Sequence, residues 1–264
     1  MGIVNVTPDS FSGDIHDIDA AHAHALRLID EGADIIDIGG ESTRPGALRV
    51  DENEELGRVL PLLQRLVLCG KPLSVDTRKP AVMRRAIDAG ASMINDVNAL
   101  RADGALAVVA ASSAAVCLMH MQGQPQTMQL APHYDDVVGE VVAYLRERVD
   151  ACSDAGIAAD RIVVDPGFGF GKTAEHNLTL LAALDKVAAL GVPVLAGLSR
   201  KGMLGKLTGR GVGERLHGSV AAALAAVTRG AAIVRVHDVA ATIDALNVWQ
   251  AAGLVPQRRD ERAR

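Results

Sequence analysis

Short apolar runs alternate with helical patterns along this chain, and this alternation most constrains its fold. Eight runs predict strands at 1–6, 33–38, 72–76, 92–96, 115–119, 161–165, 193–197 and 231–235. Helical patterns lie between the runs, for example at 20–32, 52–68 and 175–191. Eight strands that alternate with helices are more typical of a closed parallel (β/α)8 TIM barrel than of an open sheet. We therefore predict one α/β barrel over residues 1–256, followed by a charged, frayed tail at 257–264.

Composition and charge exclude several classes of protein. The apolar runs are too short to span a membrane, and a net charge of −5 without a basic cluster argues against a nucleic-acid partner. The three cysteines are far apart and lack CxxC spacing, which favours reduced thiols over disulfides or a zinc site. The opening residues show no secretory signal. We therefore expect a cytoplasmic protein without nucleic-acid or membrane partners.

Aromatic residues are scarce, at 2% of the chain. The three phenylalanines, Phe11, Phe168 and Phe170, all fall in segments rich in Gly, Pro or Ser, where a packing role is less expected. Aromatic side chains gathered in loops favour a stacking surface for a ring-shaped ligand.

A barrel places its chemistry just beyond the carboxyl ends of its strands. Polar residues follow nearly every predicted strand: Asn5, GGESTRPG (39–46), Asp76, Asn95 and Asp96, Met119 and His120, Asp165, GLSRKG (197–202) and RVHD (235–238). Helix capping accounts for some of the Asp and Asn, but Arg44, Lys201, Arg235 and His237 are poor N-caps. The pattern therefore indicates a ligand pocket at this end of the barrel.

The residue types divide the predicted pocket into two parts. Carboxylate and amide groups suit a planar ligand with several N–H groups and a carbonyl, and they are Asp76, Asn95 and Asp165. Cationic groups suit a phosphate or carboxylate, and they are Arg44, Lys201, Arg235 and His237. The ligand is therefore either a heterocycle joined to an anionic group or a pair of substrates.

The segment DPGFGFGK (165–172) resembles a nucleotide-binding loop but fits neither template. The P-loop pattern requires Gly where Pro166 stands, and the dinucleotide pattern requires Gly where Lys172 stands. We expect its glycines to let the backbone approach a ligand closely. His120, which ends the fifth predicted strand, either lines the pocket or is a satisfied core histidine. Cys117 is most simply a buried small hydrophobe.

Eight motifs together resemble one known family. In chain order they are NVTPDSFS, DIGGESTRPG, SVDTRK, INDV, MHMQG, DPGFGFGK, GLSRK and RVHDV. They look like those of the dihydropteroate synthases of bacterial folate biosynthesis, and the resemblance extends from residue 1 to about residue 252. The family fold is a (β/α)8 barrel, in agreement with the strand pattern.

The resemblance implies a transferase and sulfonamide target. Its substrates would be 4-aminobenzoate and 6-hydroxymethyl-7,8-dihydropterin diphosphate, and its products 7,8-dihydropteroate and diphosphate. It also implies Mg²⁺ as a cofactor, with Asn5 as a metal ligand, and a homodimer formed through late helices such as the Ala-rich segment 219–234. Ordinary packing of that segment against the barrel is the alternative.

By matching motif positions, the resemblance assigns residues to roles. The catalytic residues would be Asp76, Asp165, Lys201, Arg235 and His237. Substrate would also be bound by Thr43, Arg44, Pro45, Asn95, Met119, Phe170 and Gly197. Among these, the pterin would contact Asp76, Asn95, Asp165 and Lys201, and the diphosphate would contact Thr43, Arg235 and His237.

Two departures from the family pattern keep alternative functions open. Gly202 stands where most relatives have Ser. In the first loop, relatives usually have an acidic residue directly after Ser12 and then two glycines, whereas this chain has Gly13 followed by Asp14. One alternative is a non-catalytic pterin-binding paralogue. The other is a pterin-dependent methyltransferase, although the STRPG and SRK segments favour the synthase.

Overall fold

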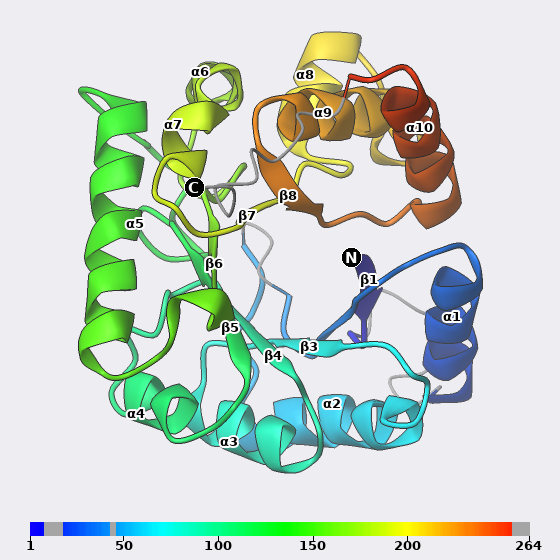
Figure 1. Cartoon of the computed structure of the whole chain (residues 1–264), viewed down its shortest axis with the longest axis vertical. Helices are drawn as coiled ribbons and strands as arrows, with labels where there is room; N and C mark the ends of the chain where they lie inside the picture. Colours follow the sequence, from blue (N-terminus) through cyan, green and yellow to red (C-terminus); the bar gives the residue numbers. More distant parts are fainter. Residues whose placement is uncertain (8–17, 43–45, 255–264) are drawn as a thin grey trace, which may run out of the picture.

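The computed structural model describes residues 1–7, 18–42 and 46–254 (Figure 1). The strands are β1 Gly2–Asn5, β2 Ile36–Gly39, β3 Leu73–Asp76, β4 Met93–Asp96, β5 Ala115–Met119, β6 Ile162–Asp165, β7 Val194–Ala196 and β8 Ala231–Val234. The helices are α1 Ile18–Asp30, α2 Glu52–Leu66, α3 Pro80–Asp88, α4 Ala105–Ala110, α5 Val137–Asp154, α6 Ala174–Ala182, α7 Leu184–Ala188, α8 Gly202–Thr208, α9 Leu216–Thr228 and α10 Val239–Ala251. Two short 3₁₀ helices, η1 Ala159–Arg161 and η2 Val212–Glu214, complete the described elements.

The eight strands form one parallel sheet in chain order, β1 to β8. The sheet closes where β1 meets the residues that follow β8. There Ile3 N donates to Val236 O at 3.1 Å, and Val236 N donates to Met1 O at 2.9 Å. Helices surround the strands in Figure 1, so the predicted (β/α)8 barrel is confirmed. Parallel strands buried on both sides explain the continuous apolar runs of the sequence.

The predicted strands agree closely with the observed ones, although β2 ends one residue later than expected, at Gly39. The helix predicted at 175–191 is instead two helices, α6 and α7, which meet at Ala183 (φ −112°, ψ 24°). Apolar residues on both sides of the break pack inward, Leu180 before it and Leu184 after it, and both are fully buried. The hydrophobic pattern therefore continues through the break and does not reveal it.

Two apolar clusters hold the barrel together. The larger lies between the strands and the surrounding helices. The smaller is formed by side chains from five strand regions, Met1, Met93, Cys117, Val163 and Leu195. Cys117 is fully buried in this cluster, as the sequence predicted.

Phe168 contradicts the expectation that the phenylalanines lack a packing role. Its side chain is only 1% exposed and belongs to the larger core cluster. The loop after β6 turns this ring inward, which its Gly-rich neighbourhood did not indicate. Phe170 is half-buried, and Phe11 lies outside the described residues.

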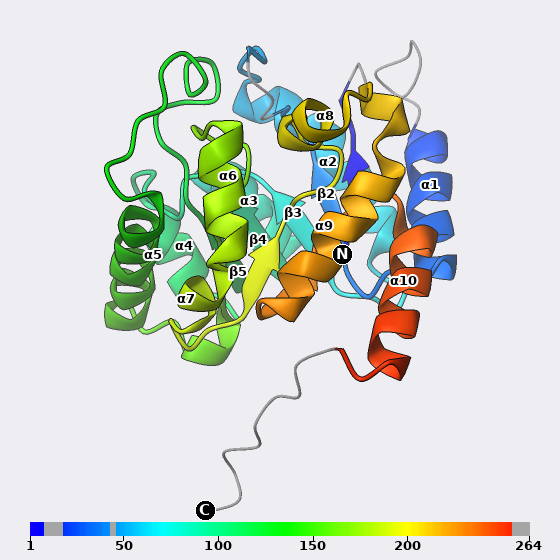
Figure 2. The same cartoon turned by 90° about the horizontal axis from the view of Figure 1, so that it is seen from above.

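Long connections and the short helix α8 gather at one end of the barrel, seen at the top of Figure 2. This is the end at which the parallel strands finish, where a barrel carries its site. In the described part of the chain, no helix is long and apolar enough to cross a membrane. Residue 256, the predicted end of the barrel, and the tail 257–264 lie outside the described residues.

Candidate active site

A cavity of about 1030 Å³ opens at the carboxyl ends of the strands. It brings together every predicted site residue that the structure describes. These are Asn5, Asp76, Asn95, Met119, Asp165, Phe170, Gly197, Lys201, Arg235 and His237. Thr43, Arg44 and Pro45 lie outside the described residues. Six of the eight strands contribute one of these residues at or just beyond their last position, and Asn95 lies one residue before the end of β4, because parallel strands all end on the same rim.

Arg235 lies between two carboxylates at the floor of the cavity. Its Nε donates to Asp37 Oδ2 at 2.6 Å, and its Nη2 donates to Asp76 Oδ2 at 3.0 Å. Asn95 Nδ2 also donates to Asp37 Oδ2, at 3.3 Å. The sequence grouped Arg235 with the anion-binding cations, but here it also belongs to the acidic part of the site. Its positive charge therefore acts both on the carboxylates of Asp37 and Asp76 and on the cavity that it lines.

Sequence reasoning missed Asp37. This residue is fully buried, and its Oδ1 has no hydrogen-bond partner among the described residues. It lies two residues before the end of β2, inside the continuous apolar run, where a charged residue is costly unless it is paired. That single acid within IDIG was the available signal.

Burial changes the acidity of the carboxyl groups that face the cavity. Burial raises the pKa of Asp76 to about 7, an effect that Arg235 opposes and the charge of Asp37 reinforces. Burial also raises the pKa of Asp165, although its Oδ1 accepts from Gly167 N at 2.7 Å and cations lie nearby. When ionised, each of these carboxylates accepts hydrogen bonds from ligand N–H groups, and a positively charged ring beside them would favour that ionised form.

The other side of the cavity is cationic and is held by the loop after β7. Ser199 Oγ lies 3.0 Å from His237 Nδ1 and accepts from His237 N at 3.2 Å. Arg200 donates to both oxygens of Asp238, from Nε at 3.0 Å and from Nη2 at 2.5 Å. Lys201 Nζ lies 4.2 Å from the centre of the Phe170 ring, within cation–π range. These contacts orient His237 and Lys201 at the rim.

The glycines after β6 serve close approach between segments of the protein itself. A Cβ on Gly167 would lie 1.8 Å from His120 O, and one on Gly171 would lie 2.4 Å from Gln122 O. Both glycines also have positive φ, 70° and 60°. These glycines are required because the backbone after β5 passes close to them. The sequence pattern instead predicted close approach of a ligand.

His120 is a core histidine. It is buried, and its Nδ1 lies 2.9 Å from Lys172 Nζ. Burial, together with the Lys172 charge, lowers the pKa of His120 to about 3, so the ring is neutral. Of the two interpretations that the sequence left open, the structure supports the second.

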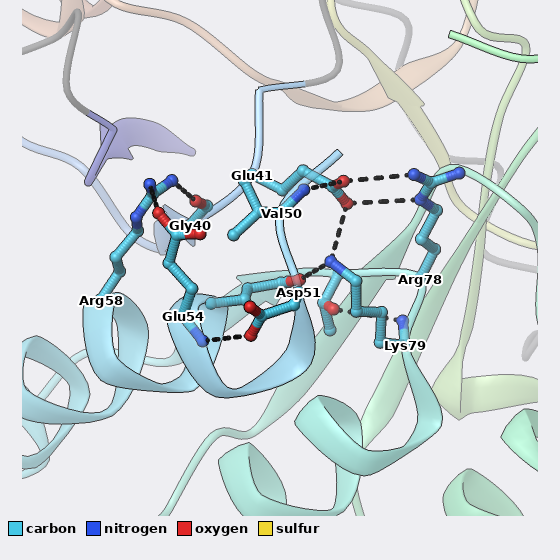
Figure 3. A network of polar contacts seen from close by, with 10 residues as sticks. Gly40, Glu41, Val50, Asp51, Glu54, Arg58, Arg78 and Lys79 are labelled. Atoms are coloured by element: carbon cyan, nitrogen blue, oxygen red, sulfur yellow. Dashed lines mark hydrogen bonds and ion pairs between the residues drawn. The ribbon is translucent and has the colours of Figure 1, made fainter. Parts of the chain in front are cut away.

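A buried network of charged groups lies beneath the connection after β2 (Figure 3). Glu41 accepts hydrogen bonds from Arg78 at 3.2 and 3.3 Å, from Lys79 at 3.1 Å and from Val50 N at 3.1 Å. Lys79 also pairs with the buried Glu55. The network joins the two ends of the 41–50 segment to the start of α3. Glu41, Arg78 and Lys79 stand within the motifs DIGGESTRPG and SVDTRK, but the pairing between them required the fold.

The described residues offer little to a metal ion by themselves. None of them forms a group of three or more His, Cys, Asp or Glu side chains able to hold one. Asn5 supplies an amide oxygen at the rim, 3.3 Å from where a Cβ on Gly39 would stand. Mg²⁺ commonly takes few protein ligands and completes its shell with phosphate oxygens and water. The donor set therefore fits Mg²⁺ only together with a phosphorylated substrate.

Fold and site together define a (β/α)8 barrel enzyme whose pocket combines acceptors for a heterocycle with cations for an anion. A sequence model described as pterin binding enzyme matches residues 1–237. The dihydropteroate synthase of Neisseria meningitidis serogroup C is 54% identical over 261 residues, covering 96% of this chain and 92% of that protein. The chain therefore belongs to the pterin-binding enzymes and, within them, to the dihydropteroate synthase family.

Solved structures agree with this placement. The dihydropteroate synthase of Xanthomonas albilineans with 4-aminobenzoic acid is 59% identical, with a TM-score of 0.91, over 97% of this chain and 93% of that one. The same organism's enzyme in complex with 7,8-dihydropteroate is 57% identical, with a TM-score of 0.88, over 97% of this chain and 94% of that one. These relatives therefore bind one substrate and one product of the expected reaction.

Proposed function

We propose that this protein is a dihydropteroate synthase, which joins 4-aminobenzoate to the methylene carbon of 6-hydroxymethyl-7,8-dihydropterin diphosphate. The observation that carries the proposal is the cavity itself. The cavity is lined by Asp76, Asn95 and Asp165 and by the cationic residues Lys201 and His237, in a chain whose close relatives bind 4-aminobenzoate and dihydropteroate.

Each group has a role that follows from its chemistry. Asp76 and Asp165 accept hydrogen bonds from the pterin N–H groups, and Asn95 pairs with the pterin edge. Lys201 reaches the same ring and lies over Phe170. Met119, Phe170 and Gly197 shape a flat slot, since Gly197 has no side chain to fill it. Thr43 would contact the diphosphate, and Arg44 and Pro45 would border the aminobenzoate. These three residues lie outside the described residues.

The reaction needs no protein nucleophile. The C–O bond to the diphosphate breaks, and the electron-rich pterin ring stabilises positive charge on the methylene carbon. The amine nitrogen then forms the C–N bond and loses a proton. Asp76 and Asp165 favour the cationic ring, while Arg235 and His237 hold the departing diphosphate. Catalysis thus consists of orientation and electrostatic stabilisation.

Mg²⁺ belongs to the proposal as a cofactor bound with the substrate. Asn5 Oδ1 would be its protein ligand, and the diphosphate and water would supply the others. When bound, the ion would neutralise charge on the leaving group.

We propose a homodimer that uses the late helices α9 and α10, since α9 is rich in small residues that allow close packing. Sedimentation velocity tests the dimer directly. The absence of CxxC spacing among the three cysteines supports a reducing, cytoplasmic location.

The experiment that tests the function is diphosphate release from the pterin substrate, with and without 4-aminobenzoate. Release that depends on the amine, together with formation of dihydropteroate, is the expected result. Pterin binding without release would overturn the proposal in favour of a non-catalytic paralogue. Transfer of a methyl group from a methylated pterin to a cobalamin protein would overturn it in favour of a methyltransferase.

A further inference from the structure

Lys172 is a buried lysine that the reaction described above does not use. Only 2% of its surface is exposed. Its Nζ lies 2.9 Å from His120 Nδ1, 3.0 Å from Gly167 O and 3.1 Å from Phe170 O. An ammonium group has three protons, so these three acceptors satisfy it completely. The site is therefore built for this side chain.

The atoms that Lys172 binds belong to the loop that carries two pterin-site residues. Gly167 N donates to Asp165 Oδ1 at 2.7 Å, and Phe170 N donates to Gly167 O at 3.1 Å. Lys172 thus donates to the first and last carbonyls of the turn Gly167–Phe170, which follows Asp165. Through His120 it also ties this turn to the end of β5.

Three other hydrogen bonds hold the same loop, so we expect it to remain folded without Lys172. Gly169 N donates to Asn177 Oδ1 at 2.7 Å, and Gln129 Nε2 donates to Gly169 O at 2.6 Å. Tyr134 OH donates to Gly171 O at 2.9 Å. Lys172 differs from these groups because it brings a positive charge.

That charge acts on Asp165. Burial lowers the pKa of Lys172 to about 7, an effect that the Asp165 charge opposes and the Lys201 charge reinforces. Below pH 7 the side chain is therefore charged, and its charge lowers the pKa of Asp165, against the effect of burial. The other titratable groups near Asp165 are Lys201, Arg235 and Cys117. Those near Lys172 are His120 and Tyr134. The rings of Tyr144 and His176 lie against His120 and Tyr134, respectively.

His120 lets the contacts of Lys172 persist when its charge is lost. Facing an ammonium, neutral His120 accepts at Nδ1. Facing a neutral amine, the other tautomer donates from Nδ1 to the amine nitrogen. In both states Lys172 retains two protons for Gly167 O and Phe170 O.

We propose that Lys172 is a positioning residue of the pterin site, which orients Asp165 and Phe170 through the turn between them and adds a positive charge near the Asp165 carboxylate. This role rests on the proposed function, because it concerns recognition of the pterin. Lys172 does not touch the substrate in this role. It acts through Gly167, Phe170 and the electrostatic potential at Asp165.

The test compares Lys172→Met, Lys172→Arg and the control Lys186→Met, which changes an exposed lysine of α7. For Lys172→Met we expect KM for the pterin diphosphate to rise at least ~10-fold, the scale for losing hydrogen bonds to a charged donor. The acid-side decline of kcat/KM should also move to higher pH by roughly 0.5 to 1 unit, because Asp165 loses a nearby positive charge. Lys172→Arg keeps the charge without the three-acceptor geometry, so it should raise KM and retain the wild-type pH profile.

Each outcome decides between the alternatives. A Lys172→Met protein with raised KM and an unchanged pH profile would reduce Lys172 to a structural support and overturn the proposal. The same holds if Lys172→Met matches Lys186→Met in both quantities. Lys172→Gln, which retains a donor without the charge, carries the same test of the pH profile if Lys172→Met does not fold. Failure of the proposed function is distinguishable, because the wild-type protein itself would then not release diphosphate.

Discussion

Arg235 Nε and Asp37 Oδ2 lie 2.6 Å apart, although 198 positions separate the two residues in the chain. The contact places a fully buried carboxylate at the floor of the cavity. Arg235 reaches Asp76 with its second nitrogen, so one cation serves two carboxylates. The floor of the site therefore carries an excess of negative charge, which suits a reaction that develops positive charge on the pterin.

Asp37→Asn tests this arrangement through the pH dependence of the reaction. The Asp37 charge helps to raise the pKa of Asp76 to about 7, and Arg235 opposes that rise. Removing the charge should lower the pKa of Asp76, so the acid-side decline of kcat/KM moves to lower pH. Ser74→Ala is the control, because Ser74 is also buried and pairs with Asp37 in the register of β2 and β3. A shift to higher pH in Asp37→Asn would contradict the interpretation.

Arg235→Ala and Asp165→Ala should each lower turnover by at least ~10²-fold, the scale for loss of one preorganised electrostatic contact. Arg235→Lys should not restore the rate, because a single ammonium does not reproduce contacts made by two separate guanidinium nitrogens. Diphosphate release at saturating substrates measures the effect, and thermal unfolding confirms that each variant is folded. Near-normal turnover in either alanine variant would contradict the role assigned to that residue.

Glu41→Ala should lower the free energy of unfolding by roughly 1–3 kcal/mol, the scale for losing hydrogen bonds to a charged, partly buried group. The Glu41 side chain is only 6% exposed, and its loss leaves Arg78 and Lys79 without a shared acceptor. Urea denaturation measures the change. Asp19→Asn is the matched control, since the ion pair of Asp19 with Arg65 lies at the surface and should contribute nothing measurable.

Gly167→Ala should disrupt the loop after β6, because its Cβ would lie 1.8 Å from a backbone oxygen and φ is 70°. We expect loss of pterin affinity and a lower melting temperature. Gly57→Ala provides the contrast. Its Cβ meets nothing within 4 Å on α2, so it should stabilise the protein by about 0.5–1 kcal/mol. Calorimetry of both variants distinguishes local clash from a general effect of removing glycine.

Gly202→Ser introduces, at the start of α8, the residue that the resemblance to the family led us to expect there. A Cβ there meets nothing within 4 Å, so the substitution should not disturb the fold. An added hydrogen bond to the aminobenzoate carboxylate should lower KM for that substrate roughly 2- to 10-fold, with KM for the pterin unchanged. Steady-state kinetics with each substrate varied in turn measures both constants. An unchanged KM for 4-aminobenzoate would show that Gly202 costs this chain no affinity.

The local pattern of the sequence was sufficient for the architecture and the location of the site. Strand runs end in Asn5, Asp76, Asn95 and Asp165, and the parallel arrangement alone requires those ends to share one rim. The same reasoning failed where no periodic signal exists. The break at Ala183 lies within an unbroken apolar pattern, and Phe168 is a core residue within a glycine-rich loop.

The sequence by itself determined the barrel, its orientation and the types of chemical group at its mouth, because these follow from periodicity and from residues adjacent to strand ends. Only the tertiary structure decided which groups pair. Asp37 with Arg235, His120 with Lys172 and Glu41 with Arg78 are contacts between separate βα units. Such pairings depend on the closure and register of the sheet, which bring distant residues within hydrogen-bond distance and leave no local mark in the chain. Burial within the fold, together with charges from other βα units, also shifts the pKa values of Asp76 and Lys172, so the electrostatics of the site belong to the fold.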